Sequence, residues 1–92
     1  MTTLSVVVIT LNEERRIAAC LAAVAWADEI IVVDSGSSDD TVAIAHGQGA
    51  RVITRPFTTY AEQKNAALAA ATGDWILSLD ADERVTPELA AE

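Results

Sequence analysis

Apolar residues in this chain are concentrated in four short runs, separated by stretches in which they recur at the spacing of a helix. The runs cover Leu4–Thr10, Glu29–Asp34, Arg51–Thr54 and 74–80. They are rich in β-branched residues and nearly continuous in hydrophobicity, which is typical of strands covered on both faces. The alternation of such strands with helices predicts an α/β fold with a parallel sheet, right-handed crossovers and helices on both faces.

Capping residues mark the ends of the first and third predicted helices. Asn12 is expected to cap the first helix, whose first turn would carry Glu13 and Glu14. The apolar face of that helix would consist of Ile17, Cys20, Leu21 and Val24. Thr59 has the spacing of a capping box with the glutamate three residues later, which predicts a third helix that runs to Gly73.

The second helix has less sharply defined ends. It is expected to begin within residues 38–40 and to end at Gly47 or Gly49. Its buried residues would be Val42 and either Ile44 or Ala45. A further helix start is predicted at residues 86–87, where proline takes the first helical position.

Composition narrows the classes of partner. The 92 residues include 14 acidic and 6 basic side chains, for a net charge of −8, which argues against binding to nucleic acid or to anionic lipid. No apolar run approaches the roughly 18 residues of a membrane span, and the N-terminus lacks the basic start of a signal peptide. We expect a cytoplasmic location, with peripheral attachment to the inner face of the membrane as the alternative.

Polar residues gather where the predicted strands end, and parallel sheets bind ligands at this edge. The first strand ends in Thr10-Leu11-Asn12-Glu13, the second in Asp34-Ser35-Gly36-Ser37 and the fourth in Asp80-Ala81-Asp82-Glu83. Carboxylates crowded at one edge repel one another unless a cation joins them. Alternate residues of an extended segment point the same way, so Asp80 and Asp82 can face one divalent ion such as Mg²⁺.

Other candidate residues have structural interpretations. Lys64 on the third helix could offset phosphate charge, although a solvated helix lysine is the default. His46 suits the last turn of the second helix, where a cation is favoured. Cys20, the only cysteine, is expected to be a small buried apolar residue, and Trp26 and Trp75 are expected in the core.

Four ordered segments carry a family resemblance: VVVITLNEE, IIVVDSGSSDDT, YAEQKNAAL and GDWILSLDADE. In this order and spacing the chain resembles family 2 glycosyltransferases, which have the GT-A fold. The variant sequences around the second and third segments are most similar to the bacterial subgroup that builds lipopolysaccharide core and related surface glycans. The resemblance implies a Rossmann-like sheet that forms the N-terminal half of a GT-A domain, and we expect the strand order 3-2-1-4.

The resemblance also implies roles for individual residues. It assigns nucleotide contacts to Thr10, Asn12, Glu13, Asp34, Ser35, Ser37, Lys64 and Asp80. Among these, Asp34 would contact the base, usually uracil, and Lys64 would lie toward the diphosphate. Asp80 and Asp82 would form the D-x-D pair, which contacts the ribose and a Mg²⁺ or Mn²⁺ ion.

The implied reaction is transfer of a sugar, with inversion, from a nucleotide-diphospho-sugar to an acceptor hydroxyl on a glycan or glycolipid. In the family the catalytic base comes from the later, acceptor-binding half, and no segment here corresponds to it. We therefore expect residues 1–92 to be one nucleotide-sugar-binding domain that ends before that half. The alternative is a binding module that holds nucleotide and catalyses nothing.

Two further classes fit less well. A phosphoacceptor signalling domain needs an acidic pair after the first strand, where this chain has Leu11-Asn12-Glu13, and a fifth strand that ends in lysine. A nucleotidyltransferase needs a glycine-rich loop after the first strand, and the four glycines lie elsewhere.

An uncovered fourth strand also predicts a homodimer, because exposed apolar sheet edges pair readily.

Overall fold

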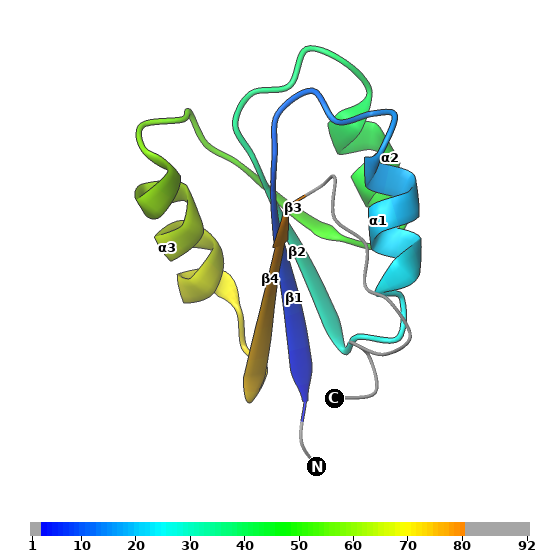
Figure 1. Ribbon diagram of the computed structural model, residues 1–92, viewed down its shortest axis with the longest axis vertical. Helices are drawn as coiled ribbons and strands as arrows, with labels where there is room; N and C mark the ends of the chain where they lie inside the picture. The colour runs from blue at the N-terminus through cyan, green and yellow to red at the C-terminus, as the bar shows by residue number, and fades with distance from the viewer. Residues whose placement is uncertain (1–2, 81–92) are drawn as a thin grey trace.

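Four parallel strands and three helices make up the part of the chain that the computed structural model describes, residues 3–80 with the backbone alone for Asp80 (Figure 1). The strands are β1 (Leu4–Thr10), β2 (Glu29–Asp34), β3 (Arg51–Thr54) and β4 (Trp75–Asp80). The helices are α1 (Ile17–Ala23), α2 (Thr41–Gly47) and α3 (Tyr60–Ala70). Asp82 and the helix start predicted at residues 86–87 lie outside the described residues.

The sheet has the strand order β3-β2-β1-β4, which confirms the predicted parallel α/β topology. In the register of β1, Thr10 is paired with Asp34 of β2, and Ile9 with Asp80 of β4. The carboxyl ends of three neighbouring strands therefore meet at one edge of the sheet, with β1 between the two aspartates. The direction of winding reverses between β1 and β4, and such a switch point is where open parallel sheets bind ligands.

Helices cover both faces of the sheet, as Figure 1 shows: α1 and α2 on one side, α3 on the other. The larger cluster, under α1 and α2, is made by Val6, Val8, Ile17, Cys20, Leu21, Val24, Val32, Ala45, Ala50 and Leu79. The smaller cluster, under α3, is made by Val7, Ile31, Val33 and Ala67. Successive residues of β1 point to opposite faces, so both clusters share this strand and its continuous hydrophobicity is explained.

The start of α1 differs from the prediction. The helix begins at Ile17 with Arg16 as its N-cap residue, so Asn12 is not the cap and Glu13 and Glu14 are not in the first turn. Asn12 instead adopts a left-handed backbone with φ 52°, and its side-chain Oδ1 accepts a hydrogen bond from the Ser38 amide at 2.9 Å. The Asn12 side chain therefore bonds the loop after β2 instead of providing the α1 cap that the local sequence predicted.

The start of α2 lies at Thr41, just beyond the predicted residues 38–40. Asp39 accepts a hydrogen bond from the Thr41 amide at 3.0 Å, while Asp40, the N-cap residue, makes no side-chain cap bond. Thr41 and Ala45 are the buried residues of this helix, and Val42 is only half-buried.

The predicted cap of α3 is confirmed, because the Thr59 hydroxyl accepts a hydrogen bond from the Glu62 amide at 3.1 Å. The helix ends at Ala70, three residues before the predicted Gly73. Its continuation is prevented by other acceptors: the amide of residue 72 donates to Glu29 at 2.9 Å, and the Gly73 amide donates to the hydroxyl of Ser5 at 2.8 Å. No helix among residues 3–80 has the length and apolar composition needed to cross a membrane.

The two tryptophans are exposed, which corrects the expectation that they lie in the core. Trp75 is 67% exposed because it begins β4, which is an edge strand of the described sheet. Trp26 is 53% exposed in the turn after α1, where its indole Nε1 donates to the Ala23 carbonyl at 2.9 Å. Cys20 is buried and His46 lies in the last turn of α2, both as predicted.

Candidate functional site

Asp34 is the centre of the polar network at the carboxyl edge of the sheet. Its side chain is fully buried. Its Oδ1 accepts hydrogen bonds from the hydroxyls of Thr10 at 2.7 Å and Ser37 at 2.6 Å. Its Oδ2 accepts from the backbone amides of Gly36 at 3.0 Å and Ser37 at 2.7 Å. Protein donors thus occupy the roughly four lone-pair positions of the carboxylate.

Two opposing effects set the protonation of this carboxyl. Burial raises the pKa of Asp34, but the hydrogen bonds from Ser37, Thr10 and Gly36 together leave that pKa below its ordinary value of 3.8. The donors stabilise the charged form, so Asp34 is a carboxylate at neutral pH. The network requires the unusual backbone of Gly36, whose φ of 104° is rarely adopted by residues with a side chain.

A series of hydrogen bonds joins the loop after β1 to the loop after β2. The Asn12 amide donates to the Ser37 hydroxyl at 2.8 Å, and the next amide, of Glu13, donates to the Thr41 hydroxyl at 2.8 Å. Farther along, the Asp40 amide donates to the Glu14 carboxylate at 3.1 Å. These bonds tie together the strand ends and loops that carry Thr10, Asn12, Glu13, Asp34 and Ser37, in agreement with the prediction that these strand ends share an edge.

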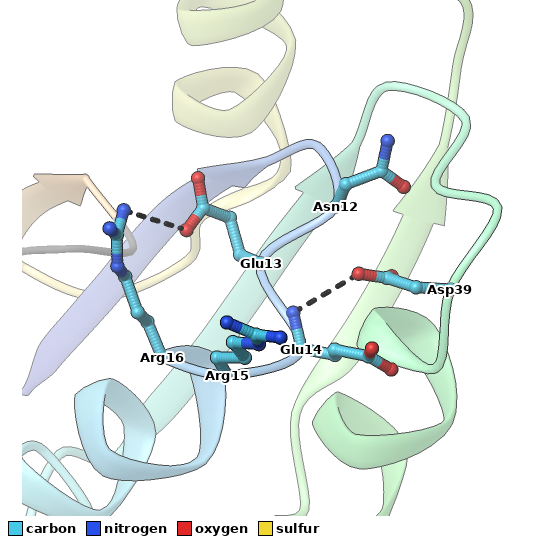
Figure 2. Close-up of a pocket in the computed structure, with 6 residues that line it drawn as sticks. All are labelled: Asn12, Glu13, Glu14, Arg15, Arg16 and Asp39. Carbon is cyan, nitrogen blue, oxygen red and sulfur yellow. Dashed lines mark hydrogen bonds and ion pairs between the residues drawn. The ribbon is translucent and has the colours of Figure 1, made fainter.

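A pocket of about 230 Å³ lies beside this network, on the side of α1 and α2 (Figure 2). It is lined by Asn12, Glu13, Glu14, Arg15, Arg16 and Asp39. Figure 2 shows the ion pair between Glu13 and Arg16, 3.7 Å apart, at one end of the pocket. Its three carboxylates outnumber its two arginines, so the lining does not favour an anionic ligand. Of the predicted site residues only Asn12 and Glu13 line it.

Ser35 lies on the other side of the network, toward α3. Its hydroxyl oxygen accepts a hydrogen bond from Nε2 of Gln63 at 3.0 Å, and its amide donates to the Thr10 carbonyl at 2.9 Å. Gln63 is not among the site residues predicted from the sequence. Its position could have indicated a role, because Gln63 stands one turn before Ala67, on the face of α3 that meets the sheet.

Lys64 follows Gln63 on α3. Its side chain is half-buried, and its ammonium lies 5.7 Å from the centroid of the Tyr60 ring. A cation at this distance from an aromatic face is attracted by the ring quadrupole. Lys64 therefore follows the residue of α3 that bonds Ser35, and its ammonium lies near the exposed ring of Tyr60.

The fold and these loops define an open parallel α/β domain of the Rossmann-like class, with polar residues gathered at the carboxyl edge of its sheet. Residues 5–92 match the sequence model of "Glycosyl transferase family 2", and the chain belongs to this family. The predicted family is thereby confirmed.

Individual relatives agree with this assignment. An uncharacterized glycosyltransferase of Rickettsia felis is 48% identical over the whole of this chain and 33% of its own length. The lipopolysaccharide core biosynthesis glycosyltransferase LpsC of Rhizobium meliloti is 37% identical over 94% of this chain and 34% of its own length. The chain therefore spans about a third of the length of these curated relatives.

A solved structure shares the fold. Glucosyl-3-phosphoglycerate synthase of Mycobacterium tuberculosis, crystallised with Mn²⁺, UDP and glucosyl-3-phosphoglycerate, is 33% identical, with a TM-score of 0.78. The match covers 90% of this chain and 36% of that protein. It confirms the Rossmann-like sheet of the GT-A fold.

Proposed function

We propose that this chain supplies the nucleotide-sugar-binding part of an inverting, hexosyltransferase-type enzyme that uses a UDP-sugar. The acceptor would be a hydroxyl of a bacterial surface glycan or glycolipid such as lipopolysaccharide core. The observation that carries the proposal is the carboxyl edge, where Thr10, Asp34 and Asp80 lie at the ends of three neighbouring strands. The related synthase that was crystallised with UDP and Mn²⁺ supports the choice of donor class.

The proposed nucleotide contacts follow the network described above. Thr10, Asn12 and Glu13 would contact the nucleotide at the end of β1, and Lys64 would lie toward the diphosphate. Asp34, with Ser35 and Ser37 beside it, would contact the base. Because protein donors occupy the Asp34 carboxylate, a base N–H must replace one of them to bind it directly.

Asp80 and Asp82 would hold a Mg²⁺ or Mn²⁺ ion together with the diphosphate. Residues 3–80 contain no group of three or more His, Cys, Asp or Glu side chains that could hold a metal ion. Asp82 and the side chain of Asp80 lie outside that description. Two carboxylates are a donor set of the kind that Mg²⁺ commonly binds, because the ion completes its shell with phosphates and water. A bound ion would supply Lewis-acid stabilisation of the departing diphosphate.

A second candidate function is nucleotide binding without catalysis. Three carboxylates near the described edge are engaged by the protein: Asp34 by four donors, Glu13 by Arg16, and Glu14 by the Asp40 amide. We assign none of them as the base that would deprotonate an acceptor. In this case the 92 residues alone would bind UDP and transfer no sugar.

Titration calorimetry of the 92-residue chain with UDP tests both candidates. The two aspartates repel a diphosphate unless a cation bridges them, so Mn²⁺ should tighten UDP binding at least about tenfold, or ~1.4 kcal/mol. Asp82→Asn should remove most of that gain, whereas Asp34→Asn should weaken binding with or without metal. Asp28→Asn is the matched control, because Asp28 accepts from the Leu4 amide at 2.7 Å, where β1 begins.

The outcomes separate the parts of the proposal. Equal UDP affinity in chelator and in Mn²⁺ would refute the metal assignment, and absence of UDP binding under both conditions would refute the donor class. Sugar transfer by the 92 residues alone, measured with a UDP-sugar and a surface-glycan acceptor, would refute the binding-only candidate.

We also propose a cytoplasmic location, peripheral to the inner face of the membrane where glycolipid acceptors are presented, and a homodimer. Support for the homodimer comes from β4, which is an edge strand of the described sheet and exposes Trp75 and Ile76.

A further inference from the structure

Gln63 occupies a position in α3 that packing alone would give to an apolar residue. It is fully buried, and with Ala67 one turn later it forms the contact of the helix with the sheet. The neighbouring cluster consists of apolar side chains, among them Ile31 and Val33. Burying an amide in such surroundings is unfavourable unless its hydrogen bonds are replaced, so the polar group at this point requires an explanation.

The hydrogen bonds of Gln63 join three separate segments. Its Nε2 donates to the Ser35 hydroxyl at 3.0 Å and to the Arg55 carbonyl at 3.3 Å. The orientation of the amide is fixed, because a backbone carbonyl can only accept. Its Oε1 is buried and has no hydrogen-bond partner among residues 3–80. The side chain thus links α3 to the loops after β2 and β3, although one of its own polar atoms is left unsatisfied there.

The bond from Gln63 holds the hydroxyl oxygen of Ser35 in place. One of its lone pairs is occupied by Gln63, and its backbone amide is held by the Thr10 carbonyl at 2.9 Å. Among residues 3–80 no hydrogen bond is made by the hydroxyl proton or the second lone pair, and both can bind a ligand. The Arg55 link tightens the same region, because the Arg55 amide donates to the Asp34 carbonyl at 3.0 Å.

We propose that Gln63 is a positioning residue of the nucleotide site, which holds the Ser35 hydroxyl, and with it the loop after β2, against the helix that carries Lys64. The ligand is a nucleoside diphosphate, so this inference rests on the proposed function. Gln63 itself makes no contact with the ligand. Its effect on binding passes through Ser35, and this dependence is what an experiment can isolate.

A double-mutant cycle measures that dependence. UDP affinity in Mn²⁺ is determined by calorimetry for the wild-type chain, Gln63→Met, Ser35→Ala and the double variant. Methionine has nearly the same size but donates no hydrogen bond, so Gln63→Met should weaken binding on the order of fivefold. In the Ser35→Ala background the same substitution should change affinity less than about twofold. Gln48→Met, the same substitution at an exposed position after α2, is the matched control and should bind like wild type.

Gln63→Glu provides a second route if Gln63→Met does not fold. Its carboxyl can donate to Ser35 only when protonated, so its UDP affinity relative to wild type should recover as the pH is lowered. Equal losses in both Ser35 backgrounds, or no loss in either, would overturn the role of Gln63 while leaving UDP binding intact. A wild-type chain that binds no UDP would instead overturn the proposed function and this inference with it.

Discussion

At the scale of single residues, Asp34 shows how a buried charge is stabilised without a salt bridge. Two hydroxyls and two backbone amides surround its carboxylate, and each donor comes from a residue at the end of β1 or in the loop after β2. Such charge-assisted bonds are stronger than those between neutral groups. Asp34 therefore organises the loop in addition to its proposed contact with the base.

The lowered pKa of Asp34 makes stability depend on pH. A carboxyl whose pKa is lower in the folded than in the unfolded protein stabilises the fold above its unfolded value, near 3.8, and this contribution is lost as the pH falls through the folded value. At neutral pH, Asp34→Asn should cost on the order of 2 kcal/mol of unfolding free energy. The difference from wild type should shrink as the pH falls below 3.8.

Denaturant unfolding monitored by circular dichroism at several pH values measures this difference. Asp40→Asn is the control, because Asp40 is exposed and makes no side-chain cap bond, so its neutral-pH stability should match wild type. A stability difference between Asp34→Asn and wild type that stays constant from neutral to acidic pH would contradict the interpretation.

At the scale of elements, the approach of β4 to β1 depends on the glycine between α3 and β4. A Cβ on Gly73 would lie 2.6 Å from the Ser5 hydroxyl and 2.8 Å from the Ser5 amide nitrogen. The same segment is fastened by Glu29, whose pKa is lowered by hydrogen bonds from the backbone of Thr72 and the hydroxyl of Ser5. No side chain fits there without moving the start of β1 or β4.

Gly73→Ala should therefore lower the unfolding free energy by about 2 kcal/mol, in the range typical of overpacking. Gly47→Ala is the matched control: it has open space around its Cβ position and an ordinary helical backbone, so stability should stay the same or rise by up to about 1 kcal/mol. Thermal and denaturant unfolding of both variants provide the comparison.

The clash lies at the start of β1, opposite the carboxyl edge, so folded Gly73→Ala should bind UDP like wild type. A selective loss of UDP binding would show that the two edges are coupled.

At the scale of the whole molecule, apolar side chains are buried on one face of the sheet and exposed at one of its edges. The face under α1 and α2 has a large buried cluster, whereas β4 leaves Trp75 and Ile76 exposed at its start. Exposed apolar edge strands pair with other strands unless they are covered. This distribution is the physical basis of the proposed homodimer.

Light scattering at increasing protein concentration tests the dimer. The wild-type chain should approach twice the monomer mass, and Trp75→Glu should stay monomeric because it places a charge at the pairing edge. Trp26→Glu changes an equally large exposed ring at a different site, in the turn after α1, and should dimerise like wild type. A wild-type monomer at every concentration would rule the homodimer out.

The sequence by itself determined the strands, the alternation of strands and helices, the cap at Thr59 and the family. These features depend on local periodicity, on a cap between neighbouring residues, or on ordered motifs, and each can be recognised without knowing what lies across the molecule. The bounds of β1, β2 and β3 are those predicted, and only the first residue of β4 differs. The meeting of Thr10, Asp34 and Asp80 at one edge also followed, because parallel strands align their carboxyl ends.

Only the tertiary structure decided which partner each polar side chain bonds. Asn12 bonds the loop after β2 in place of capping α1, the two tryptophans lie at the surface, and Gln63 holds Ser35 from another element. The two hydrogen bonds join residues 26 and 28 positions apart, and the exposure of Trp75 depends on which strand forms the sheet edge. Sequence spacing encodes neither, because a hydrogen bond of this kind is chosen by the geometry of the folded chain.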